Sequence, residues 1–169
     1  IMNIDAGNES GQGLMVASNL MITSYSLIAG KSDVTYTDET GKRKYFDGYI
    51  AADPARGIVL LKTADVHSGY IPISSTSLNS FLGTYGKTVI SMKRGNNKYV
   101  IGRVTIPGIP EIKGAWLSQS YIPRKVEYQG DKPEQGELVF SYNMLFGIIV
   151  YINGEPFHIN NRPLMELAL

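Results

Sequence analysis

The chain has 169 residues, a net charge of +1 from nearly balanced acids and bases, and no cysteine. That length allows one large domain or two small subdomains with a buried core, and the balanced charge argues against a surface that binds nucleic acid. Neither a disulfide nor a thiolate metal site can form. Two histidines, His67 and His158, are too few for a typical metal cluster, so we expect no metal and no cofactor. No apolar run approaches the roughly 20 residues that span a bilayer.

The chain begins with polar residues 1–10, which we expect to be flexible. From residue 11, short apolar runs alternate with turns about every ten residues, a spacing typical of β-barrels and sandwiches. A polar, Ser-rich connector at 63–81 separates the runs into two halves of about six strands each. The tail predicts a short helix, because Asn161 can cap it and Pro163 falls in its first turn.

The stretch Gly130–Tyr151 opens with a polar loop rich in turn formers. Two apolar runs follow, Leu138–Phe140 and Leu145–Tyr151, with the polar turn Ser141-Tyr142-Asn143 between them. Such runs predict a β-hairpin. Since the second run is apolar at almost every position, we expect it to be a central strand covered on both faces.

The order of these motifs resembles the trypsin-like serine proteases, most closely their HtrA/Deg branch. Four segments carry the resemblance. Gly11–Val16 matches the family's first barrel strand, and Thr23–Gly30 matches the segment that contains its histidine. Asp53–Lys62 matches the segment of its aspartate, and Lys132–Val139 matches the loop of its nucleophile. It covers about residues 9–169. The resemblance implies an all-β fold of two antiparallel six-stranded β-barrels, at 11–78 and 79–169, with the C-terminal helix attached to the second barrel.

The three catalytic positions that the resemblance implies carry none of the family's catalytic residues. Ser26 stands in the place of the histidine, Gly57 in that of the aspartate and Glu134 in that of the serine, while a one-residue shift would give Gln135. Acyl transfer by this fold needs a nucleophile, an imidazole base and an orienting carboxylate. Its oxyanion hole needs backbone N–H groups, and Pro133 has none. We therefore predict a pseudoprotease without catalytic activity.

Binding is the function that remains. In the family, a peptide pairs with the segment after the closing Gly-Ile, which here is Ile149, Val150, Tyr151 and Ile152. Backbone pairing needs no catalytic side chain, so these four residues are the candidate site for a protein or peptide partner. An unpaired apolar edge has to be covered or used, and we expect the loop Lys132–Glu137 to narrow this cleft, with partners docking on exposed tyrosines.

Our interpretation is an HtrA-like domain for protein–protein interaction or assembly. The chain is expected to belong to a larger multidomain protein, and the resemblance implies an extracytoplasmic location. Two alternatives remain open: a hydrolase with a relocated active site, and a purely structural domain of a larger complex. We expect His67 to be a solvated loop residue and His158 to lie partly buried on a strand.

Overall fold

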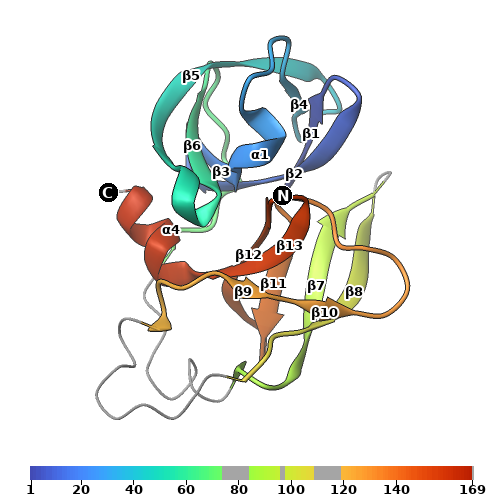
Figure 1. The fold of residues 1–169 in the computed structure, drawn as a ribbon. Helices are drawn as coiled ribbons and strands as arrows, with labels where there is room; N and C mark the ends of the chain where they lie inside the picture. The colour runs from blue at the N-terminus through green and yellow to red at the C-terminus, as the bar shows by residue number, and fades with distance from the viewer. Residues whose placement is uncertain (74–83, 96–97, 109–118, 169) are drawn as a thin grey trace.

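The computed structural model describes residues 1–73, 84–95, 98–108 and 119–168 (Figure 1). The fold is all-β, with two barrel-like sheets and a short C-terminal helix, as predicted. The elements in chain order are β1 Met2–Ala6, β2 Glu9–Ala17, β3 Leu20–Ser24, α1 Tyr25–Ile28, β4 Thr35–Thr37, β5 Arg43–Asp53, the 3-10 helix η1 Pro54–Arg56, β6 Ile58–Thr63, β7 Thr88–Arg94, β8 Tyr99–Thr105, β9 Arg124–Lys125, β10 Glu127–Tyr128, β11 Leu138–Ser141, β12 Met144–Ile152, β13 Glu155–Asn160 and α4 Asn161–Leu167.

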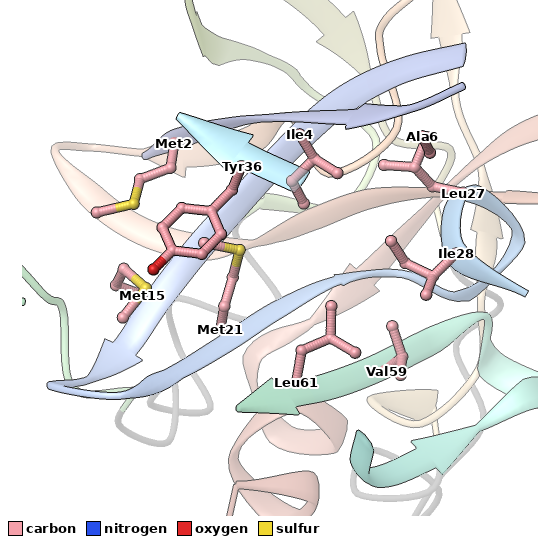
Figure 2. Packing of buried hydrophobic residues seen from close by; sticks show 10 residues of the cluster. All are labelled: Met2, Ile4, Ala6, Met15, Met21, Leu27, Ile28, Tyr36, Val59 and Leu61. Atoms are coloured by element: carbon pink, nitrogen blue, oxygen red, sulfur yellow. The ribbon is translucent and has the colours of Figure 1, made fainter. Parts of the chain in front are cut away.

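The first sheet is a closed six-stranded barrel in the order β1-β2-β3-β6-β5-β4. Its first strand corrects the expectation that residues 1–10 are flexible, since β1 pairs with both β2 and β4. The physical reason is a period of two that the polar neighbours conceal: Met2, Ile4 and Ala6 alternate with Asn3 and Asp5 and point into the barrel. Figure 2 shows these three side chains in the barrel core, which also contains Met15, Met21, Leu27, Ile28, Tyr36, Val59 and Leu61.

In the described part of the chain, the second sheet has seven strands in the order β10-β8-β7-β11-β12-β13-β9, instead of the six predicted. The additional strand arises because β9 and β10 are two short pieces of one passage of chain. Between them, Val126 N donates to Pro156 O at 3.2 Å, and its side chain is buried in the core of this sheet. The sheet is therefore nearly closed. The predicted boundary between the barrels, at residues 78 and 79, lies outside the described residues.

The central hairpin is confirmed by the pairing of β11 with β12. Its turn places Tyr142 at φ 51° and Asn143 at φ 65°, the paired left-handed conformations typical of a tight hairpin turn. β12 lies between β11 and β13, as expected for a covered central strand. The helix α4 begins one residue earlier than predicted, because Asn160 caps it by accepting a bond from Arg162 N at 3.1 Å, while Asn161 donates to Leu145 O at 2.6 Å.

A shared apolar core joins the two barrels to α4, which Figure 1 shows beside the first barrel. Its buried members come from β2, β3 and β6 on one side and from β11, β12, β13 and α4 on the other: Leu14, Val16, Ile22, Ile58, Leu60, Leu138, Ile148, Val150, Ile159 and Leu164. Burial of this many aliphatic side chains holds the barrels at a fixed mutual orientation. In the part of the chain that the structure describes, no helix has the length and apolarity needed to cross a membrane.

Candidate functional site

A hydrogen-bonded cluster of three polar side chains lies where the barrels meet. Ser24 ends β3, Ser26 lies in α1, and Gln135 comes from the loop that precedes β11. Gln135 Oε1 accepts from Ser24 Oγ at 2.6 Å and from Ser26 Oγ at 2.5 Å. Its amide nitrogen faces Glu9 Oε2 at 3.3 Å. The side chain of Gln135 thus links the two barrels and has all its polar atoms engaged.

The structure brings Gln135 to Ser26, and it directs Glu134 elsewhere. Glu134 accepts from Gln12 Nε2 at 3.1 Å and forms an ion pair with Lys93 at 3.4 Å. The resemblance placed Glu134 opposite Ser26, or Gln135 if shifted by one residue. The residue that contacts Ser26 is Gln135. Ser24 was not singled out from the sequence, because nothing in its neighbourhood distinguishes it from an ordinary strand residue.

Backbone contacts determine which loop residue reaches Ser26. Gln12 N donates to Gln135 O at 2.8 Å, and Gly136 N donates to Ile149 O at 2.7 Å. Gly136 has φ +83°, and a Cβ there would lie 1.8 Å from Gln12 O. No residue with a side chain can take this position without moving the β2 backbone. Gly136 therefore sets the loop register that places Gln135.

Gly57 lies against apolar side chains instead of polar ones. It ends η1 with φ +69°, and its carbonyl accepts from Tyr25 N at 2.7 Å. A Cβ at Gly57 would lie 3.1 Å from Val150 Cγ2 and 3.3 Å from Ile152 Cγ1. The position next to α1 at which the resemblance expects an orienting carboxylate therefore has two aliphatic side chains as its nearest neighbours.

The loop before Gln135 covers part of the candidate binding segment. Tyr151 Oη donates to Pro133 O at 2.5 Å, and Lys132 Nζ lies 4.8 Å from the centre of the Tyr151 ring. Lys132 also donates to Gly154 O at 2.9 Å. Burial under this loop raises the pKa of Tyr151 to about 12. The phenol is therefore a neutral donor at every physiological pH.

The four candidate binding residues differ in how far they are accessible. Ile149 and Val150 are fully buried, and Tyr151 and Ile152 are half-buried. One side of this segment pairs with β13. On the other side, Ile149 N donates to Glu137 O at 2.8 Å and Tyr151 N donates to Ser24 Oγ at 3.2 Å. The chain's own groups thus occupy the backbone donors that a bound peptide would use at Ile149 and Tyr151.

Neither histidine can assist chemistry at this cluster. His67 is 2% exposed, so the expectation of a solvated loop residue is wrong: its ring bonds Tyr36 Oη at 2.7 Å and Glu39 Oε2 at 3.1 Å. His158 is fully buried in the second sheet, more deeply than expected, with Nε2 3.0 Å from Phe146 O. Desolvation lowers the pKa of His158 to about 4. Both imidazoles therefore have their hydrogen-bond partners outside the cluster.

One carboxyl group near the cluster has an unusual proton affinity. Glu137, just after Gly136, is 5% exposed, and its burial raises its pKa to about 7 despite the Ser91 hydroxyl and the Lys93 ammonium nearby. Among the described residues, no group of histidine, aspartate and glutamate side chains is arranged to hold a metal ion. The cluster provides hydrogen bonds between the barrels, and the acceptor of both serine hydroxyls in it is an uncharged amide oxygen.

The fold is that of the trypsin-like serine proteases, as its similarity to solved structures shows. The Rv3671c protease of M. tuberculosis in its inactive form aligns with a TM-score of 0.67 and 13% identity over 98% of this chain and 85% of that one. The MamO protease domain of Magnetospirillum magneticum aligns with a TM-score of 0.65 and 13% identity over 98% of this chain and 93% of its own. Deg5 aligns with a TM-score of 0.65 and 16% identity over 98% of this chain and 85% of its own.

The HtrA-type protease AlgW, solved with a tripeptide, aligns with a TM-score of 0.68 and 14% identity over 99% of this chain and 58% of that one. At these identities the likeness shows the fold alone. No family model matches the sequence, and no curated protein matches it.

Proposed function

We propose that this chain, which has the fold of HtrA- and Deg-type trypsin-like proteases, is a non-catalytic pseudoprotease domain that serves protein–protein interaction or assembly. The observation that carries the proposal is the closed cluster around Gln135, whose amide oxygen accepts from both Ser24 and Ser26. A glutamine amide cannot attack a carbonyl, and a serine hydroxyl cannot act as a general base at neutral pH.

The surroundings of the cluster support the same conclusion. Gly57 provides no carboxylate and faces Val150 and Ile152. Pro133 has no N–H to stabilise an oxyanion, and its carbonyl is already bound by Tyr151. Because a catalytic triad acts as a unit, the loss of all its members leaves no relay to be repaired by one substitution. The resemblance to HtrA/Deg-type proteases also leads us to propose an extracytoplasmic location.

Activity-based labelling tests the catalytic part of the proposal. We expect a fluorophosphonate probe to label no serine of the wild-type protein, and casein and simple esters to remain intact. The variant that combines Ser26→His, Gly57→Asp and Gln135→Ser is expected to remain inactive too, because Pro133 still occupies the oxyanion loop. Labelling of any serine in the folded wild-type protein would refute the proposal and favour a relocated active site.

The interaction part needs a test of its own. Cross-linking in native extract would compare wild type with Tyr151→Lys, which places a charge at the covered segment, and with Tyr142→Lys, a matched change at a hairpin tip that is 77% exposed. We expect partners of wild type to be retained by Tyr151→Lys, because Pro133 and Ser24 already occupy that segment. Loss of partners in the folded Tyr151→Lys variant alone would show that the former cleft is the binding site.

A further inference from the structure

Part of β8, the strand next to β10 in the second sheet, has no strand partner on one side among the described residues. β8 pairs with β7 along its whole length, from Tyr99 to Thr105, but β10 pairs only with Val104 and Thr105. In Figure 1, β8 follows β7 at the right of the lower sheet. The pairing of β10 ends at Tyr128, and within the described residues no strand continues it alongside the remainder of β8. We call residues 99–102 the open edge.

The backbone groups of the open edge face outward. At the hairpin end of β8, Gly95 N donates to Lys98 O at 2.7 Å. At the other end, Ile106 N donates to Lys87 O at 3.3 Å, and Lys87 directly precedes β7. Lys98 and Ile106, both even-numbered, therefore direct their backbone groups toward the β7 side. Since direction alternates along an antiparallel strand and this pairing has no register shift, Tyr99 and Ile101 direct their N–H and C=O groups away from the sheet.

The side chains of the open edge favour an added strand. Tyr99 is 56% exposed, Val100 38% and Ile101 62%, and all three are aromatic or β-branched residues that fit a pleated sheet. A groove of about 680 Å³ runs beside Ile101 and Arg103 and is bounded across from them by residues 127–129. An edge of this kind attracts another strand, and proteins commonly protect theirs by charges, bulges or a covering loop.

The charges at the two ends of the open edge select the occupant. Lys98 and Arg103 flank it, and neither forms an ion pair with any described residue. A second copy pairing antiparallel would bring two of each cation onto one short ladder, which like-charge repulsion disfavours. Among the described residues that line the groove, Glu127 is the one carboxylate, and it forms no ion pair with Arg103. A strand with acidic residues at both ends would complement both cations.

We infer that the open edge binds an extended segment of a partner protein, apolar in its middle and acidic at both ends, which adds to β8 as an antiparallel strand. The inference deepens the interaction role proposed above and rests on it, but it places the partner on β8, away from the covered segment at Tyr151. Outward N–H and C=O groups of Tyr99 and Ile101 provide the affinity, and Lys98 and Arg103 provide the selectivity.

The test uses two synthetic fluorescent peptides with alternating valine and threonine in the middle, one with paired glutamates at both ends and one with paired lysines. Fluorescence anisotropy measures their dissociation constants. We expect the glutamate peptide to bind at least about tenfold more tightly than the lysine peptide, since two charge pairs replace two repulsions. Amide NMR shifts should concentrate at residues 99–103. Equal binding of the two peptides, or shifts centred on Tyr151, would overturn the inference.

Backbone and charge variants sharpen the test. Ile101→Pro removes an outward N–H without cutting the β7–β8 ladder, and we expect it to weaken the glutamate peptide about tenfold. Ile101→Thr keeps the N–H and controls for the side chain. The double variant Lys98→Glu, Arg103→Glu should reverse the preference in favour of the lysine peptide, whereas Lys125→Glu, on β9, should not.

Failures of the two proposals are distinguishable. Unchanged binding to folded Ile101→Pro would overturn the edge site and leave the pseudoprotease proposal intact. Fluorophosphonate labelling would overturn the pseudoprotease proposal whatever the peptides do. A wild-type dimer in light scattering that Ile101→Pro converts to a monomer would show that a second copy occupies the edge, contrary to the inference.

Discussion

Replacing Gln135 by alanine should lower the free energy of unfolding by about 2 kcal/mol, and the structure says which contact is responsible. The substitution removes the acceptor for both Ser24 and Ser26. Ser26 is exposed, so water replaces its lost bond at little cost. Ser24 is fully buried, so its hydroxyl is left without an acceptor, which costs about 1–3 kcal/mol. The destabilisation should therefore come mostly from Ser24.

Urea unfolding followed by far-UV circular dichroism measures the effect, with Gln129→Ala as the matched control at an exposed loop position. A loss of about 2 kcal/mol corresponds to a fall in Tm of roughly 4–8 °C for a domain of this size. A double-mutant cycle should give a Gln135–Ser24 coupling of about 1 kcal/mol or more and a smaller Gln135–Ser26 coupling. A change below about 0.5 kcal/mol, or equal to that of Gln129→Ala, would refute the reasoning.

Three further predictions concern buried positions. Gly57→Asp should destabilise the protein by about 2 kcal/mol or more, since φ is +69° and a Cβ would lie 3.1 Å from Val150 Cγ2. Thermal unfolding measures the effect, and Gly30→Asp is the control, because Gly30 also has a left-handed backbone but has open space around it. Equal losses of stability in the two variants would contradict the prediction. The pKa of His158 is about 4 in the folded protein and 6.5 in the reference state. Since the unfolded chain therefore binds a proton first as pH falls, the free energy of unfolding should decrease between pH 6.5 and 4. This effect is worth about 3 kcal/mol in wild type and should be absent from His158→Leu. The pKa of Glu137 is raised from 4.5 to about 7, so stability should fall by up to about 3 kcal/mol as pH rises through that interval, and Glu137→Gln should abolish the fall. Because these two titrations oppose each other in wild type, urea unfolding from pH 4 to 8 should show steeper, opposite slopes in the two variants, and parallel slopes would contradict both assignments.

The succession of short strands along the chain and the central hairpin could be predicted from the sequence because their signals are local. Apolar runs, their spacing and the turn at Tyr142 and Asn143 depend on residues close together in the chain. The prediction that the chain lacks a triad is local in the same sense, since it rests on residue types at matched motifs. The strand at Met2–Ala6 was missed even though its period of two is also local, because its polar members obscured it.

The site itself was decided by tertiary structure. In a polar loop, a shift of one residue leaves the local pattern unchanged, so the sequence could not choose between Glu134 and Gln135 opposite Ser26. The choice depends on Gly136, where β2 approaches so closely that Gln12 O leaves no room for a side chain, and on the bond from Gln12 N that orients Gln135. Both contacts join residues more than a hundred positions apart, and they exist only once the two barrels have packed together.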